Sequence, residues 1–235
     1  MTYQTNFWNR YFKYYDVLLK VIPYRELMKE LVSAASIKIN QRILDLGTGT
    51  GNLRYFLPSD VHIIGIDNSS EALAYAKNKF PYSENIKQSI LETLPFRDNS
   101  FDRIITNNVL YTLNKGDWNK VVSELHRILK PNGIIVVSNL HIDFKAISIY
   151  LDHIKKSISK KGFLFTFFQL LNLIYPTIQM MRYNKKISKD NENETYSFVS
   201  DNDQVKIFEE HGFKSISSSL KVYSDQARMN VFEKE

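Results

Sequence analysis

The feature that most constrains the fold of this chain is a short apolar run that ends in a cluster of glycines. Residues 42–46 (Arg-Ile-Leu-Asp-Leu) are typical of a buried strand, and Gly47, Gly49 and Gly51 occupy the positions that follow. Glycine tolerates positive φ and, because it has no Cβ, lets the backbone approach a ligand closely. A glycine turn between a strand and a helix is typical of ligand sites in open α/β sheets.

The rest of the chain alternates between strand and helix patterns. Because strands that alternate with helices favour a parallel sheet, we predict one α/β core with right-handed crossovers. Three residues, too few for a crossover helix, join the last two predicted strands, which should pair antiparallel. The polar run Ser188–Thr195 is predicted to be a linker or mobile loop. Helices are predicted over residues 7–22, 24–35, 71–79, 118–129 and 203–210, strands over 61–66, 101–106, 134–138, 214–223 and 227–232, and a turn at Lys130–Gly133.

The residues around the glycine turn indicate which ligand it suits. A dinucleotide fingerprint would need glycine where Asn52 stands, and a phosphate loop would need a lysine after Gly51. Asp45, just before the glycines, disfavours an anionic pyrophosphate. A ligand that carries an ammonium or sulfonium group fits this acid better.

Four segments, in order along the chain, resemble the motifs of class I S-adenosylmethionine-dependent methyltransferases. They are similar to those of the small-molecule branch (methyltransferase type 11), which includes the ubiquinone and menaquinone methyltransferases. The resemblance covers about Ile39 to Asn139. The segments are Ile43–Gly51, Ile64–Asp67, Leu94-Pro95-Phe96 with Asn99–Asp102, and Glu124–Gly133.

The resemblance implies a Rossmann-like α/β fold: a seven-stranded, mostly parallel sheet with an antiparallel last strand, N-terminal helices and a helical lid insertion. It also implies S-adenosylmethionine as cofactor, S-adenosylhomocysteine as product, and methyl transfer to a small hydrophobic or lipid-like acceptor. We expect an N-terminal helical cap at 1–38, the cofactor-binding core at 39–140, the lid insertion at 141–202, and a C-terminal helix and hairpin at 203–235.

By position, the resemblance also implies a cofactor site. Asp67 would accept both ribose hydroxyls, and Asp45 would lie near the ammonium group. The family usually has an acid near the adenine where Ser89 or Ile90 stands here, so adenine would be held by backbone groups, by the Ser89 hydroxyl, or less tightly. The implied site comprises Asp45, Gly47, Thr48, Gly49, Gly51, Asp67, Asn68, Ser89, Ile90, Leu91, Asn107 and Tyr15.

Candidate catalytic residues are few, because the sulfonium methyl is already activated and a base is needed only if the acceptor must lose a proton. We name His141, just beyond the fifth predicted strand, and Tyr111. The segment Asn107–Leu110 lacks the Asn/Asp-Pro-Pro-Tyr motif, which disfavours methylation of planar amino nitrogens. The chain has no cysteine, so it has no disulfide or thiolate nucleophile, and we expect no metal site.

The excess positive charge of the chain lies in the predicted insertion. Residues 141–189 contain nine lysines and arginines and two aspartates, a local charge of +7, around the apolar run 162–175. This run is too broadly apolar for a one-sided surface helix, so we expect it to be covered by the acceptor and its own domain, by a second subunit, or by a membrane surface reached through 160–186. The lid would select a hydrophobic acceptor, including one with negative charge.

Two other functions stay open. An RNA or protein methyltransferase could use the basic segment as an electrostatic footprint, although its apolar centre disfavours nucleic acid. A non-catalytic scaffold of the same fold would explain the missing adenine-side acid. The first twenty residues lack the apolar run of a signal peptide, and no long charge-free apolar span is evident, so we expect a cytoplasmic enzyme.

Overall fold

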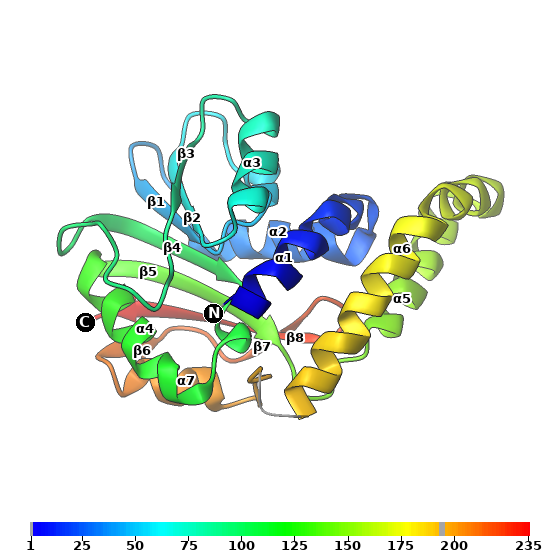
Figure 1. Cartoon of the computed structure of the whole chain (residues 1–235). Helices are drawn as coiled ribbons and strands as arrows, with labels where there is room; N and C mark the ends of the chain where they lie inside the picture. Colours follow the sequence, from blue (N-terminus) through cyan, green and yellow to red (C-terminus); the bar gives the residue numbers. More distant parts are fainter. Residues whose placement is uncertain (1, 193–195) are drawn as a thin grey trace.

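A mixed β-sheet forms the centre of the protein in this computed structural model, which describes residues 2–192 and 196–235 (Figure 1). Within these residues the strand order is β3-β2-β1-β4-β5-β8-β6, and β7 also pairs with β8. Strands β1 to β5 pair in parallel, and β8 runs antiparallel to β5, as predicted. The bounds are β1 Arg42–Leu46, β2 His62–Asp67, β3 Glu84–Lys87, β4 Phe101–Asn107, β5 Leu129–Leu140, β6 Phe213–Ser215, β7 Leu220–Val222 and β8 Ala227–Lys234.

The strand order reverses at β1, and this reversal positions the site. Leu46 at the end of β1 lies beside Ile66 of β2 on one side and Thr106 of β4 on the other. The segments that leave β1 and β2 therefore turn to one side, and the segment that leaves β4 turns to the other. A crevice opens between them at the carboxyl edge of the sheet. The segments that follow these three strands meet there.

Helices cover both faces of the sheet, because side chains alternate between the faces along each strand. Ile43 packs toward α1, α2, α5 and α6, whereas Leu44 and Leu46 pack toward α4 and α7. Each fully buried side chain of this kind stabilises the fold by roughly 1.5–3 kcal/mol. The helices are α1 Thr2–Tyr15, α2 Ile22–Ala35, α3 Ser70–Lys79, α4 Lys115–Ile128, α5 Ala146–Lys161, α6 Phe163–Glu192 and α7 Asp203–Glu209; short 3-10 turns are η1 Asp16–Lys20, η2 Asn52–Phe56 and η3 Leu110–Thr112.

Two predicted strand boundaries are wrong, for local reasons. The predicted turn Lys130–Gly133 instead lies within β5, which begins at Leu129 directly after α4, and a register shift between Phe101 and Arg103 accommodates the extra residues. The predicted strand 214–223 is split into β6 and β7. Between them the Ser217 hydroxyl accepts the N–H of Val231 on β8, which interrupts the backbone ladder.

The insertion between β5 and α7 is built mainly from α5 and α6, which run beside each other at one side of the molecule (Figure 1). It starts and returns at one point, because Val199 donates to the carbonyl of Leu140 and Ile142 donates back to Val199. The predicted linker 188–195 is wrong over 188–192, where α6 continues, since Ile187 remains buried against the N-terminal helices; residues 193–195 lie outside the described part.

Candidate functional site

The glycine turn closes over the carboxyl edge of the sheet. Gly47 has φ +73°, and a Cβ there would lie 2.2 Å from the Val109 side chain, so only glycine fits. The N–H groups of Gly47 and Thr48 both donate to the carbonyl of Ile66, each at 2.8 Å. These bonds tie the turn to β2 and leave its inner surface as bare backbone facing the crevice.

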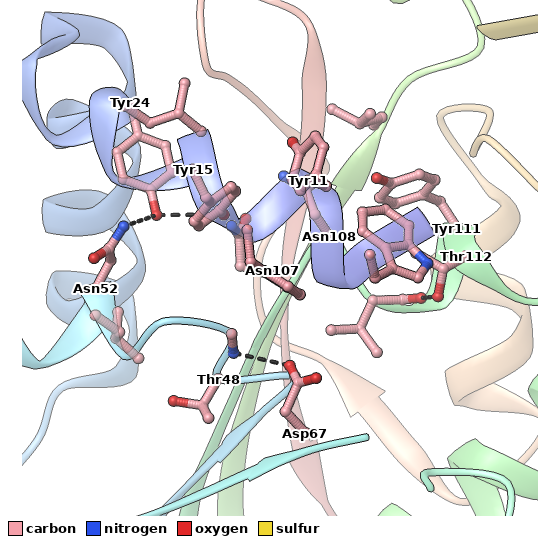
Figure 2. Close-up of a pocket in the computed structure, with 18 of the residues that line it drawn as sticks. Tyr11, Tyr15, Tyr24, Thr48, Asn52, Asp67, Asn107, Asn108, Tyr111 and Thr112 are labelled. Carbon is pink, nitrogen blue, oxygen red and sulfur yellow. Dashed lines mark hydrogen bonds between the residues drawn. The ribbon is translucent and has the colours of Figure 1, made fainter. Parts of the chain in front are cut away.

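Asp67, the last residue of β2, is oriented by two backbone N–H groups. Gly49 donates to its Oδ2, as Figure 2 shows, and Ser69 donates to its Oδ1, both at 2.9 Å. Burial raises the pKa of Asp67, and these hydrogen bonds oppose the rise. Ser69 in turn caps α3 by accepting the N–H of Ala72. The carboxylate is therefore held in place with acceptor capacity left over for a ligand.

Asp45 is the second carboxylate in the crevice and is 5% exposed. Thr48 Oγ1 donates to its Oδ2 at 2.6 Å. Burial raises the pKa of Asp45 to about 6, despite the Thr48 hydrogen bond. A cationic group beside Asp45 would favour its ionised form, so this position suits an ammonium group better than an anion.

A latch of polar side chains holds the N-terminal segment against the glycine turn. Lys79 Nζ donates to both oxygens of Asp16, at 2.9 and 2.8 Å, and to Asn52 Oδ1 at 2.6 Å. Thr50 also donates to Asp16, at 2.6 Å. We did not predict Lys79 from the sequence; the helix register that places it opposite Asp16 has no local signal. The latch fixes the start of η1, and with it Tyr15, beside the crevice.

Aromatic side chains build the other half of the same cavity (Figure 2). They come from the N-terminal helices, from η3, from the insertion and from the turn before β8. Tyr150 Oη is buried and has no partner among the described residues. Sequence reasoning missed most of this half, because its members are far apart in the chain. They are Trp8, Tyr11, Phe12, Tyr15, Tyr24, Tyr111, Phe144, Tyr150 and Tyr223, joined by Leu140, Ile149, Met180 and Asn184.

The structure brings most of the predicted site residues into this one cavity. Those that line it are Asp45, Gly47, Thr48, Gly49, Asp67, Asn68, Ser89, Ile90, Leu91, Asn107, Tyr15 and Tyr111. Gly51, with φ +76°, is instead where the turn packs on α3, because a Cβ there would lie 3.2 Å from that of Ala76. Its place is structural rather than cavity-lining.

His141 does not line the cavity in the part of the chain that the structure describes. Its ring lies between two acids, with Nε2 3.4 Å from Asp201 and Nδ1 3.5 Å from Asp143. The bridge to Val199 fixes the backbone at this point, while Leu140 before it and Phe144 after it line the cavity. A catalytic role of His141 therefore stays a prediction, from a side chain that lies outside the described cavity lining.

The cavity residues fit S-adenosylmethionine. Two buried acceptors, Asn107 Oδ1 and Asn108 Oδ1, lack partners among the described groups, and an unpaired buried acceptor costs about 1–3 kcal/mol. Both residues line the cavity, where amino or ammonium groups of a ligand could satisfy them. Ser89 Oγ accepts the N–H of Leu91 at 3.3 Å and keeps its own hydrogen as a donor. The acid that the family usually has near the adenine is absent here, but the Ser89 hydroxyl remains as a hydrogen-bond donor at that position.

Comparison with known proteins also indicates a methyltransferase domain in the core of the chain. The family model of a methyltransferase domain matches residues 44–137. The ubiquinone/menaquinone biosynthesis C-methyltransferase of Geotalea daltonii is 33% identical over 52% of this chain and 57% of its own length. The demethylmenaquinone methyltransferase of Thermus thermophilus is 32% identical over 52% of this chain and 59% of its own. This chain thus spans only a little over half the length of these curated relatives.

Solved structures share the fold across nearly the whole chain. A TehB-like S-adenosylmethionine-dependent methyltransferase from Corynebacterium glutamicum has a TM-score of 0.63, 15% identity and full coverage of both chains. The N-methyltransferase NodS from Bradyrhizobium japonicum, bound to S-adenosylhomocysteine, has a TM-score of 0.60 and 13% identity, covering 92% of this chain and 90% of its own. Residues 44–137 of this chain thus match a methyltransferase domain, and the whole chain has the fold of S-adenosylmethionine-dependent methyltransferases.

Proposed function

We propose that this chain is a methyltransferase that transfers the methyl group of S-adenosylmethionine to a small, uncharged and largely hydrophobic acceptor. The observation that carries the proposal is the continuity of the cavity. The glycine turn with its two carboxylates and the aromatic half lie in one connected space. A cofactor at one end would therefore meet an acceptor at the other without solvent between them.

Each carboxylate has a role that its surroundings support. Each oxygen of Asp67 already accepts one backbone N–H and can accept one ribose hydroxyl as well. Asp45 would face the ammonium group, and the side-chain oxygens Oδ1 of Asn107 and Asn108 would be further acceptors. When bound, S-adenosylmethionine supplies a methyl group on a sulfonium, already activated for transfer.

The lining of the aromatic half supports an uncharged acceptor. Among the described residues of the cavity, Asp45 and Asp67 carry the formal charges, and both lie at the cofactor end. The lysines and arginines of the insertion do not line the described cavity, so an acceptor with negative charge would find no cation there. The sequence allows a hydrophobic acceptor with or without charge, and we restrict the proposal to a neutral one.

Tyr111 is proposed to orient the acceptor rather than to remove a proton from it. Burial raises the pKa of Tyr111 far above its usual range, so its hydroxyl stays protonated and donates. Two bonds fix its backbone, from Tyr111 N to Asn139 Oδ1 and from Ser197 N to the Tyr111 carbonyl. Alignment and exclusion of water then supply most of the rate enhancement.

Calorimetric titration with S-adenosylhomocysteine, followed by transfer of labelled methyl from the cofactor into small-molecule extracts, tests the proposal. We expect binding, and label in an apolar, solvent-extractable product. Binding without any transfer would favour a scaffold, and label in RNA or protein would favour the other enzyme class. Absence of binding would contradict the whole assignment. A cytoplasmic location is part of the same proposal and is tested by cell fractionation.

A further inference from the structure

One side of α6 is a continuous apolar stripe that faces solvent. Its members recur every three or four positions, at 164, 167/168, 171, 174/175 and 178, so they lie on one side of the helix. Such a stripe is unusual on a surface unless another surface covers it. The stripe consists of Leu164, Phe167, Phe168, Leu171, Ile174, Tyr175 and Ile178, with exposed fractions from 46% to 70%.

The opposite side of α6 is packed on the protein. Thr166, Leu173 and Met180 are each at most 3% exposed, and Met180 lines the cavity. By length and composition, α6 could cross a membrane, and only 17% of its most apolar window is buried. Because its inner side contacts α1, α5 and η1, the helix can lie along a membrane but cannot cross one without leaving its domain.

Charge decides between the surfaces that could cover the stripe. No charged residue occurs from Gly162 to Met181, and cations stand at both ends of this run. Glu26 and Asp152 pair with Lys156, and Glu26 also pairs with Lys160. The exposed cations nearby are Lys155, Lys161, Arg182, Lys185 and Lys189. Two copies meeting through this stripe would bring like charges together, whereas an anionic bilayer would attract them.

We propose that α5 and α6 dock the protein on anionic lipid bilayers. The stripe of α6 enters the region between headgroups and acyl chains, and the cations at its ends contact lipid phosphates. The same helix then has lipid on its outer side and the cavity on its inner side. Uptake of a hydrophobic acceptor from the bilayer rests on the proposed function, but the docking itself does not.

Vesicle flotation with the whole chain tests the docking. One set of vesicles contains phosphatidylcholine alone, and in the other part of it is replaced by anionic phosphatidylglycerol. We expect about tenfold more bound protein with the anionic vesicles, and a loss of this gain at high salt. Equal binding to both sets, or binding to neither, would overturn the proposal.

Matched variants locate the contact on the protein. The double variant Phe167→Ser/Phe168→Ser should lose about tenfold in vesicle binding, whereas Tyr82→Ser, at a 102% exposed tyrosine between α3 and β3, should not. Likewise Lys161→Glu/Arg182→Glu should weaken binding, and Lys120→Glu on the exposed side of α4 should leave it unchanged. Equal losses in a variant and its control would contradict the assigned face.

Two further measurements distinguish lipid docking from misfolding of the variants and from self-association. Titration with S-adenosylhomocysteine shows whether each variant is folded, because none of the substituted residues lines the cavity. A variant that still binds S-adenosylhomocysteine but no longer floats with the vesicles supports the docking, even if no methyl transfer is ever found. Light scattering that shows a dimer of the wild type, converted to a monomer by Phe167→Ser/Phe168→Ser, without vesicle binding, would assign the stripe to a second copy and overturn the proposal.

Discussion

The two halves of the cavity are built in different ways. The cofactor end consists of backbone and two carboxylates placed by the ends of β1 and β2, which adjoin in the sheet. The acceptor end consists of side chains from α1, η3, α5, α6 and the turn before β8. A site made by strand ends is fixed by the sheet, whereas one made by helices can change with each helix. Under the proposed function, the sheet core would set the identity of the cofactor, and the helices and turns attached to it would set the identity of the acceptor.

The largest expected effect is at the cofactor end. Asp67→Ala removes a carboxylate proposed to accept two ribose hydroxyls, and each such bond is worth about 1.5–3 kcal/mol. We expect affinity for S-adenosylhomocysteine to fall by about 100-fold or more in calorimetric titration. Asp60→Ala, at an exposed loop acid before β2, is the control and should bind normally. An unchanged affinity in Asp67→Ala would contradict the assignment of this end of the cavity to the cofactor.

The pH dependence of binding sharpens the role of Asp45. Burial raises its pKa to about 6 in the ligand-free fold, so the carboxyl group is mostly protonated below that pH. Folding then binds extra protons between the unfolded value of 3.8 and about 6, and stability contributed by Asp45 falls as pH rises through that window. A ligand whose ammonium group lies beside Asp45 needs the ionised carboxylate, so its affinity should rise up to about tenfold per pH unit below about pH 6 and level off above it.

Asp45→Asn is the control for this titration. The variant should lose the pH-dependent step and bind the ligand weakly at every pH, because the amide carries no charge. If the step persists in the variant, another group causes it. The measurement is the dissociation constant of S-adenosylhomocysteine over a series of buffers of equal ionic strength.

The latch at the N-terminal segment should have a smaller effect. Lys79→Met leaves Asp16 without its ion pair, and since the lysine is half-buried we expect a loss of about 1 kcal/mol, or roughly fivefold in cofactor affinity. Hydrogen exchange should increase in α1 and η1. Lys77→Met on the exposed side of the same helix should change neither quantity. Equal effects of the two variants would show that the latch does not hold the segment.

The smallest effect on cofactor affinity is expected at the acceptor end. Tyr150→Phe removes a buried hydroxyl without a described partner, so the ligand-free protein should become more stable by about 1 kcal/mol in thermal unfolding. Affinity for S-adenosylhomocysteine should not change. A higher KM for the acceptor with unchanged cofactor affinity would show that the two halves act separately, and parallel changes in both would contradict the division.

The same division explains what could be predicted from the sequence. Four of the five parallel strands were predicted, because β1, β2, β4 and β5 each contain a compact apolar run and the glycine turn is contiguous. The edge strand β3 was missed, because its sequence Glu-Asn-Ile-Lys is mostly polar. The acceptor end could not be, because Tyr150 and Tyr223 come together only through the packing of α5 beside the turn before β8. His141 was predicted near the cavity because it follows β5, but its ring lies beside Asp143 and Asp201 and not in the described cavity lining.

That pairing has a consequence for how the protein can change. The chain leaves the sheet at Leu140 and returns beside it at Val199, so the two ends of the insertion that contains α5 and α6 are adjacent. Grafting a different insertion between these two residues would leave every strand pairing intact. Replacing the insertion would therefore change the part of the cavity lined by Phe144, Ile149, Tyr150, Met180 and Asn184, while the glycine turn and its two carboxylates stay as they are.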